Sequence, residues 1–549
     1  MMTPTRIPVF LFLTVAFPAA GAARAILLHP DASGAPVIGP AIREAPPGST
    51  IRLAKGLYRE YIKIEKPLTL EGEEGAVIDP SEPLPAAWQA APEFGKGVYK
   101  AALARTPYTV FIDGKPLAQV NPERKETVAE GPWFWKTLLA SGTPRTGFRY
   151  VRGLWLYRRE DRAIYLHLEN DVDPATHTWT AVWTRDAAIT ISKTDDAAVR
   201  GLSIQHAYSG VAVADHARRS SVTQCKISLW DKNGVMVRSG AAAALVEGNQ
   251  IFRDSYESFV PISGPNSKDA YEIWQLHKTA GFYDRVGISL SMSGAGHRIH
   301  ANHVYETFDG IDVGENEFES LDIPLPGTDY ERDTEIWENL IERTRDSGME
   351  IGGPAINLRV HHNVLRRTHG GLRYKLPRIG PVFIYRNVLV DGSPFNIWYS
   401  MDDSPAEGYV YHNTIVGSSF GLLYSSMNAY RETGARNWHY LNNLVVTDRG
   451  FFDTRSTGAK NVPMRFTSDY NVVQGEGRPY PDDPTRDRHS RYMKELPMAP
   501  GFPPKPPPGS AAIDAGLDLS TYFHGGPLPG CEPGYFKGRA PDAGAYEIQ

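Results

Sequence analysis

The chain has 549 residues, of which 41% are hydrophobic and 22% charged, and its formal net charge at pH 7 is -5. This hydrophobic content is that of a globular protein with a substantial core, which excludes an extended disordered chain. The small negative charge excludes a general attraction to nucleic acid or to an anionic membrane surface, so we expect no nucleic-acid partner.

The N-terminus predicts a secretory signal peptide over residues 1–25. Arg6 precedes an apolar run over residues 7–20, and the small residues of Ala23–Ala25 suit cleavage after Ala25. A membrane anchor is the alternative. Because no later apolar run has spanning length, we expect no membrane insertion of the mature chain and a secreted or periplasmic protein.

The remaining chain divides into segments that differ in the spacing of their predicted strands. Residues 26–87, with "IRLAKGLYREYIKI", predict opening coils made of short, closely spaced strands. Residues 88–186 lack this short strand spacing. They contain "YTVFIDGKPL" and "GLWLYRREDRAIYLHL", which indicate a small β-rich insertion. Short, closely spaced strands are again predicted over residues 187–475, which should form the main β-helix. The Pro-rich residues 476–549 are expected to form a tail that packs on the last coils.

An internal repeat is the strongest signal in the sequence. The segments "VEGNQIF", "IHANHVY", "IWENLIE", "VHHNVLR", "IYRNVLV", "VYHNTIV" and "YLNNLVV" each place an Asn between short apolar pairs. Most are followed, after about eight residues, by a small residue and a second short strand. The aligned residues are Asn249, Asn302, Asn339, Asn363, Asn387, Asn413 and Asn443.

This pattern predicts an all-β, single-stranded, right-handed parallel β-helix with a small β-rich insertion. Each coil contributes one strand to each of several parallel sheets. The Asn tolerates a left-handed backbone, and its amide can bond neighbouring coils. Leu202 and Cys225 take the Asn position in earlier coils, so we expect Cys225 to be a packed core thiol and no disulfide with Cys531.

Two further segments, "TFDGIDV" at Thr307–Val313 and "TRDSGMEI" at Thr344–Ile351, repeat an acid, a Gly and a second acid. The repeat alignment puts Asp309, Asp346 and His369 at the position before the Gly. It puts Asp312, Glu350 and Arg373 at the first outward position of the next strand. Stacked strands lie about 4.7–4.9 Å apart, so these side chains should stand side by side on one outer face.

Acids this close to one another are unfavourable unless they are used or neutralised, and one should have a raised pKa. A carboxylic acid beside a carboxylate can act as general acid and as nucleophile or base at a glycosidic bond. The candidate catalytic residues are Asp312, Glu350, Asp309 and Asp346. Alternatively, Asp309 and Asp346 cap their turns, or the outward acids simply solvate the surface or pair with Arg373 on the neighbouring coil.

Further side chains near the acids are candidates for substrate binding: His369, Arg373, Lys375, Trp398 and Tyr399, with Tyr424 on a later coil. The aromatic residues suit stacking on sugars, although packing is the alternative. Long connections at Tyr271–Arg285 and Glu315–Asp333 should wall a groove. No metal-ligand or cofactor motif is present; a calcium ion between the acids is compatible with their oxygen ligands.

The chain resembles the pectate-lyase-like superfamily of secreted β-helix proteins that act on polysaccharides, through "VHHNVLRR", "VYHNTIVG" and "IRLAKGLYREYIKI". The insertion with "DGKPL" and "LWLY" is further similar to glycoside hydrolase family 141 and its relatives. That resemblance implies catalytic acids on consecutive coils, at Asp312 and Glu350. The superfamily includes hydrolases, lyases and epimerases, so the fold alone does not choose among them.

Three functions remain open. The first is a secreted carbohydrate-active enzyme, a glycoside hydrolase with a carboxylate pair on adjacent coils, acting on a polysaccharide or oligosaccharide. The second is a polysaccharide lyase or epimerase on uronic-acid polysaccharides, with Arg373 and Lys375 neutralising the substrate carboxylate. The third is a non-catalytic glycan-binding β-helix.

Overall fold

The computed structural model describes residues 22–120, 151–253, 285–314, 331–375, 379–392, 395–399, 406–418, 421–426, 437–453, 466–475 and 484–548. For 395–399, 418, 423–426, 452–453 and 484, only the backbone is described. The expected signal peptide therefore lies outside the described residues except for residues 22–25. No described helix has the length and apolar character needed to cross a membrane.

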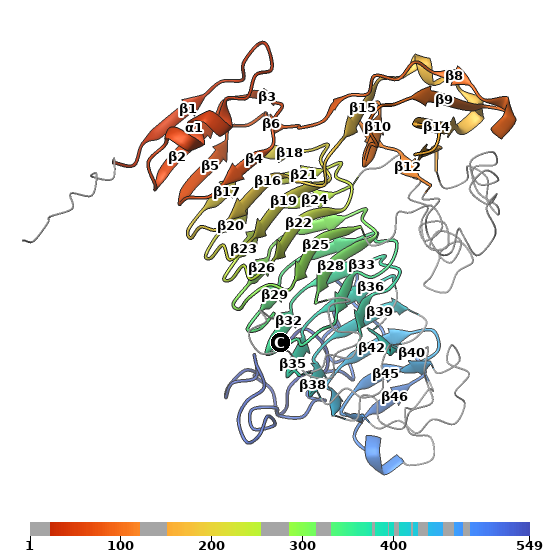
Figure 1. Cartoon of the computed structure of the whole chain (residues 1–549). Coiled ribbons are helices and arrows are strands. Elements are labelled where there is room, and N and C mark those ends of the chain that lie inside the picture. The colour runs from red at the N-terminus through yellow and green to blue at the C-terminus, as the bar shows by residue number, and fades with distance from the viewer. Residues whose placement is uncertain are drawn as a thin grey trace, which may run out of the picture.

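The expected right-handed parallel β-helix is confirmed. Three long parallel sheets of 13, 13 and 11 described strands run along its axis, and each complete coil adds one strand to each sheet (Figure 1). We name them sheet A, sheet B and sheet C.

Sheet A contains, in spatial order, β1 (Ala25–Leu28), β2 (Ser49–Leu53), β5 (Leu68–Gly72), β17 (Ala198–Arg200), β20 (Ser221–Thr223), β23 (Leu245–Glu247), β26 (Arg298–His300), β29 (Glu335–Trp337), β32 (Leu358–His361), β35 (Val382–Tyr385), β38 (Gly408–Tyr411), β41 (Trp438–Leu441) and β44 (Thr467–Asp469). Sheet B contains β3 (Gly56–Tyr58), β6 (Ala76–Ile78), β18 (Ser203–Ile204), β21 (Lys226–Ser228), β24 (Gln250–Phe252), β27 (His303–Tyr305), β30 (Leu340–Glu342), β33 (Val364–Arg366), β36 (Val388–Val390), β39 (Thr414–Ser418), β42 (Leu444–Thr447), β45 (Val472–Gln474) and β46 (Arg491–Met493). Sheet C contains β4 (Ile62–Ile64), β16 (Ala187–Ser192), β19 (Ser209–Ala214), β22 (Asn233–Arg238), β25 (Val286–Ser291), β28 (Asp309–Val313), β31 (Met349–Ile351), β34 (Leu372–Tyr374), β37 (Phe395–Tyr399), β40 (Leu422–Ser426) and β43 (Phe452–Asp453).

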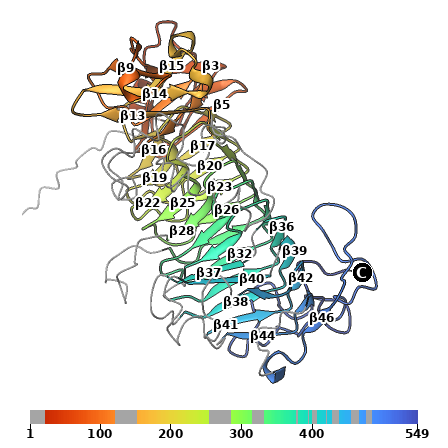
Figure 2. The ribbon, with the colours of Figure 1, turned by 90° about the vertical axis from the view of Figure 1, so that its right-hand side faces the viewer.

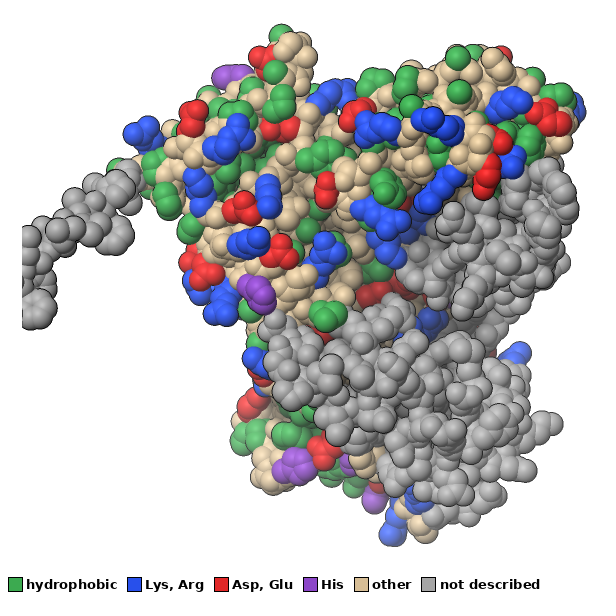
Figure 3. All heavy atoms as spheres, viewed as in Figure 1, with side chains coloured by type: hydrophobic (Ala, Val, Ile, Leu, Met, Phe, Trp, Pro, Cys, Tyr) green, Lys and Arg blue, Asp and Glu red, His purple; other side chains and the backbone are tan. Residues whose placement is uncertain are grey.

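The core lies between the three sheets and consists mainly of Ile, Val and Leu from alternate strand positions. Strand alternation sends the intervening residues outward. Outside the core, acidic and basic side chains are interspersed over the part of the β-helix visible in Figure 3. Glu71 on β5, for example, pairs with Arg52 on β2 and Arg200 on β17.

The Asn ladder is present and stabilises one corner of the coils. Each predicted ladder Asn is buried, and its Oδ1 or Nδ2 bonds the neighbouring ladder residue; Asn363 Nδ2, for example, donates to Asn387 Oδ1 at 2.9 Å. The ladder continues to Asn471, which the repeat alignment missed. Cys225 joins it through its backbone N–H, which donates to Asn249 Oδ1, and burial raises the pKa of its thiol to about 12. Both cysteines are free.

The expected left-handed backbone falls on a different residue. It is the residue before the Asn that has positive φ: Ala301, Glu338, His362, Arg386, His412, Asn442 and Tyr470. A left-handed residue other than Gly costs roughly 1–2 kcal/mol. The amide bonds of the following Asn satisfy the buried backbone groups at this corner and offset that cost.

A helix at the N-terminal end was not predicted. α1 (Ile38–Glu44) inserts Ile38 and Ile42 into the core and so covers the first coils. Glu60 accepts hydrogen bonds from the backbone N–H groups of Val37, Ile38 and Gly39 at 2.8–2.9 Å. These bonds satisfy N–H groups that a helix N-terminus leaves without an intrahelical partner.

Two small sheets lie between β6 and β16 and form one end of the molecule in Figures 1 and 2. One contains β11 (Lys115–Pro116), β10 (Thr109–Ile112), β15 (Trp179–Val182) and β7 (Glu82–Pro83). The other contains β12 (Ala118–Gln119), β13 (Gly153–Arg158), β14 (Ala163–Leu168), β9 (Val98–Ala102) and β8 (Gln89–Ala90). Short 3-10 helices occur at Pro92–Phe94, Glu169–Asp171 and Pro174–Thr176. These sheets begin with β7, whereas the expected insertion begins at residue 88.

The C-terminal segment follows a 3-10 helix at Pro484–Asp487 and packs on the outside of the last coils (Figure 2). Leu519, Leu528 and Cys531 cover aromatic side chains of sheet A. Leu496 and Ala543 pack against sheet B. Sheet C therefore differs from the other two sheets, because the described tail residues pack on sheets A and B.

Candidate functional site

Three charged residues stand side by side on the outer side of sheet C. Asp312 on β28 is in register with Glu350 on β31, and Glu350 with Arg373 on β34. Their strand neighbours, such as Ile311 and Ile351, belong to the core, so the charged positions point outward. The register expected for these three residues is confirmed.

Burial distinguishes these acids from ordinary surface charges. The exposed fraction is 3% for Asp312 and 2% for Glu350. Taking a carboxylate out of water costs several kcal/mol unless ions or hydrogen bonds compensate. The alternative in which these acids simply solvate the surface is therefore wrong.

The motif alignment was wrong by one residue at Asp309. Because Ile311 is in register with Met349, Asp309 lies beside Ser347, not beside Asp346. Ser347 N donates to Asp309 Oδ1 at 2.8 Å, which confirms this pairing. The error arises because "TRDSG" has one residue more between its acid and its Gly than "TFDG".

The Gly in both motifs has a steric cause. A Cβ added to Gly310 would lie 2.2 Å from the carbonyl oxygen of Gly348, and one added to Gly348 would lie 2.8 Å from that of Gly371. Real Cβ atoms essentially never approach this closely, so consecutive coils require Gly at this corner. The repeated Gly therefore belongs to the stacking of the coils.

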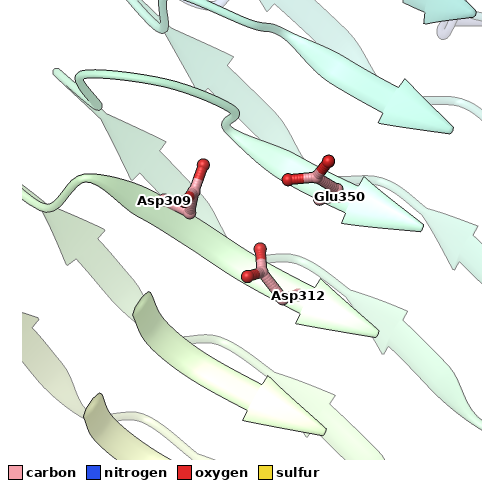
Figure 4. A group of neighbouring side chains, drawn as sticks. All are labelled: Asp309, Asp312 and Glu350. Carbon is pink, nitrogen blue, oxygen red and sulfur yellow. The ribbon is translucent and has the colours of Figure 1, made fainter. Parts of the chain in front are cut away.

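Asp309, Asp312 and Glu350 form one compact group of carboxyl groups. Each offers an oxygen, and these oxygens all lie within 4.8 Å of one another. Figure 4 shows the three side chains on the same side of two adjacent strands. Asp309 comes from the first residue of β28, whose backbone N–H donates to the carbonyl of Arg285 at 3.1 Å.

Two cations compensate part of this negative charge. Lys375 Nζ lies 2.8 Å from Glu350 Oε1, and Arg373 Nη1 lies 3.6 Å from the same oxygen. Arg373 Nη2 also lies 2.5 Å from Asp346 Oδ1. Burial alone would lower the pKa of Arg373, but Asp346, Glu350 and Asp309 outweigh it and raise that pKa further above its usual range.

His369 lies one coil beyond Asp346, at the edge of the same cluster. Burial lowers its pKa; Asp346 opposes this effect, while Arg373 and Arg345 add to it. The imidazole is therefore neutral at neutral pH, when it can accept or donate a proton but cannot serve as a fixed cation.

Three charged residues near the site were missed by sequence reasoning. Arg345, next to Asp346, is 3% exposed. Arg285 precedes β25 and pairs with Asp231 at 2.7 Å, in a buried position on the neighbouring coils. Arg345 could have been found from its place inside the acidic motif. Asp231 and Arg285 are 54 residues apart, so no local sequence pattern connects them.

Some of the expected substrate-binding features cannot be placed at side-chain level. Trp398 and Tyr399 lie in β37, which is adjacent to β34, and Tyr424 lies in β40; their side chains are outside the described residues. Most of the expected walls at Tyr271–Arg285 and Glu315–Asp333 also lie outside the described residues.

The group of three acids also has the composition of a site for a hard cation. Calcium binds carboxylate oxygens at about 2.3–2.6 Å, so oxygens on opposite sides of the ion lie roughly 5 Å apart. Asp309, Asp312 and Glu350 satisfy that limit. Lys375 competes with such an ion, because it already neutralises Glu350.

No protein-family model and no curated protein matches the chain. Among solved structures, XylC in complex with xylose is 12% identical, with 88% of this chain and 86% of that chain covered and a TM-score of 0.46. A pectate lyase is 11% identical, with 97% and 98% covered and a TM-score of 0.35. A polygalacturonase from Erwinia carotovora subsp. carotovora is 12% identical, with 81% and 97% covered and a TM-score of 0.38. At these values the likeness says nothing about the chemistry of the site.

Proposed function

We propose that the protein is a carbohydrate-active enzyme, a glycoside hydrolase that cleaves a polysaccharide or oligosaccharide at the carboxyl groups of Asp312 and Glu350. The observation that carries this proposal is the close group of buried acids on adjacent strands, with oxygens within 4.8 Å of one another. Kinship with glycoside hydrolase family 141 is part of the proposal, supported by the doubled acidic motif and the small sheets between the opening and main coils.

The short separation favours a retaining mechanism. Retaining glycosidases place their two carboxyl groups about 5–5.5 Å apart, whereas inverting enzymes leave about 6.5–9.5 Å for a water molecule. Stacking on adjacent strands holds Asp312 and Glu350 at about one strand spacing, roughly 4.8 Å.

The two cations near Glu350 support a division of roles between the acids. Lys375 and Arg373 stabilise negative charge on Glu350, which suits a nucleophile that attacks the anomeric carbon. Asp312 then donates its proton to the leaving oxygen as the glycosidic bond breaks. In the second step Asp312 takes a proton from water, whose oxygen attacks the anomeric carbon and releases Glu350.

Asp309 and Asp346 have supporting roles in this scheme. Asp309 accepts the hydrogen bond of Ser347 N and so joins the two strands that carry the catalytic pair. Asp346 holds the guanidinium of Arg373, which faces Glu350. In this scheme both are therefore positioning residues. This role resembles the turn-capping alternative more than it resembles direct catalysis.

Glycan profiling with product analysis tests the proposal. The wild type is incubated with a panel of plant, algal and microbial glycans, and the first-formed anomer is identified by NMR. Asp312→Asn and Glu350→Gln should each reduce turnover by about 10²–10⁴-fold, the usual contribution of general acid–base catalysis. Glu335→Gln is the control, because Glu335 on sheet A pairs with His361 and lies outside the site. Full activity in both site variants would refute the assignment.

A polysaccharide lyase is the second candidate, favoured by the fit of Asp309, Asp312 and Glu350 to a divalent cation beside Arg373 and Lys375. In this scheme the cation and the two basic residues would bind a uronic-acid carboxylate. Lyase products carry an unsaturated end that absorbs ultraviolet light. Unsaturated products whose formation stops with EDTA and resumes with calcium would support the lyase and contradict the hydrolase. Binding of glycans without any product would leave the non-catalytic function.

Secretion is a further part of the proposal, supported by the apolar run and small residues within residues 1–25. N-terminal sequencing of protein exported by a bacterial host should begin at Ile26. Retention of Met1 in the exported chain would contradict cleavage.

A further inference from the structure

A cavity lies away from the acids, between sheet B and the C-terminal segment. Its volume is about 320 Å³. Val364 on β33 and Val388 on β36 line it from the β-helix, and Ala545 lines it from the tail. This volume is at the lower end of the range for ligand pockets, roughly 300–1,000 Å³, and suits a molecule the size of one sugar ring.

Hydrogen bonds hold the tail wall of this cavity in place. Ala545 N donates to Thr414 Oγ1 at 2.9 Å, and Ile548 N donates to Asp542 Oδ2 at 2.7 Å. The imidazole Nδ1–H of His412 donates to the carbonyl of Asp542 at 3.0 Å. The cavity therefore has a preformed wall and not a loosely attached one.

Two cations face the cavity. Arg386 occupies the left-handed corner before Asn387, and Lys505 comes from the tail. Lys505 Nζ lies 4.5 Å from the centre of the Tyr546 ring, which is also part of the lining. Neither cation forms a side-chain ion pair with a carboxylate in the described part of the chain. Cationic groups beside an apolar surface are a common arrangement for binding an organic anion.

The acid that lines the cavity, Glu547, cancels only part of this positive charge. Burial and the nearby Asp542 raise the pKa of Glu547 to about 7; Arg386 opposes the shift, and Asp514 adds to it. Near neutral pH Glu547 is therefore partly protonated, while Arg386 and Lys505 remain charged.

We propose that this cavity binds a small organic anion about the size of one acidic sugar unit, with its acidic group at Arg386 and Lys505. Its apolar face would lie on the side chains of Val364, Val388 and Ala545. The proposal does not depend on the chemistry of the acids on sheet C.

Titration calorimetry with D-glucuronate as the probe tests it. Saturable binding is expected, and D-glucose, which lacks the carboxylate, should bind at least tenfold more weakly. Arg386→Gln and Lys505→Gln should each weaken glucuronate binding by about tenfold or more, as expected for the loss of a hydrogen bond to a charged group. Lys505 is exposed, so its variant tests the site without a risk to folding.

Two controls locate the binding. Arg367→Gln alters an exposed left-handed corner residue outside the cavity and should leave binding unchanged. Glu350→Gln should also leave it unchanged. Undiminished binding in both cavity variants, or loss of binding in Glu350→Gln, would overturn the proposal. Equally tight binding of inorganic sulfate would also overturn it, because the organic part of glucuronate would then contribute nothing to the affinity.

Discussion

Lys375 and Glu350 form the shortest described contact between a cation and the proposed catalytic pair, with 2.8 Å between Nζ and Oε1. Because Asp309 and Asp312 crowd the same carboxylate, removing the cation makes negative charge on Glu350 less favourable. Lys375→Met should therefore lower kcat by about 10²-fold and move the acidic limb of the pH–rate profile to higher pH. Lys494→Met, at an exposed position of the tail, is the matched control. An unchanged acidic limb would contradict this role of Lys375.

The ion pair of Arg373 with Asp346 should contribute to folding as well as to the site. Breaking a buried pair leaves one charge uncompensated, so Arg373→Met should lower the free energy of unfolding by about 3–5 kcal/mol. The double variant with Asp346→Asn should lose less than the sum of the two single losses. Denaturant unfolding of the four proteins measures this coupling. Strict additivity would show that the two side chains do not stabilise each other.

The Asn ladder should be sensitive to the loss of a single member. Asn387 Oδ1 accepts from the N–H of Asn363, and Asn387 Nδ2 donates to the carbonyl of Val360. Asn387→Ala leaves both buried backbone groups without these partners, at about 1–3 kcal/mol each. We expect a loss of about 2–5 kcal/mol in chemical denaturation, against less than about 0.5 kcal/mol for the exposed Gln250→Ala. Similar losses in the two variants would refute a special role for the ladder.

Glu547 should make stability depend on pH. Its pKa is about 7 in the folded protein, above the ordinary 4.5, so folding favours the protonated form. The resulting stabilisation is fully present below about 4.5 and is lost as the pH rises through about 7. The thermal midpoint of the wild type should fall over this window more than that of Glu547→Gln. Glu495→Gln, at an exposed tail position, should show the wild-type slope.

The repeat was predictable because each coil carries its own short signal, an Asn between apolar pairs. The same register correctly placed Asp312, Glu350 and Arg373 in one row. It failed at Asp309, because an alignment by acid and Gly cannot show which of two motifs contains an extra residue. The hydrogen bond from Ser347 N resolves this in the structure.

Features that depend on distant partners were not predictable. α1 has only seven residues, too few for its single i, i+4 pair, Ile38 and Ile42, to identify a helix, and it forms where these two side chains can cover the core. The burial of Asp312 and Glu350 was likewise not predictable, because the sequence pattern shows only whether a side chain points inward or outward. Direction follows from strand alternation, whereas burial depends on the packing of the whole molecule.

The junction between the small sheets and the β-helix is a position at which the protein can be re-engineered. β4, β5 and β6 pair directly with β16, β17 and β18, so the coils stack across the interruption without a gap. Lengthening a connection costs little, about 0.6 kcal/mol for each doubling of loop length. This junction is therefore a natural graft position: an unrelated module could replace the small sheets, or a short linker could join Asp79 to Asp186, while the coils that carry Asp312 and Glu350 keep their register.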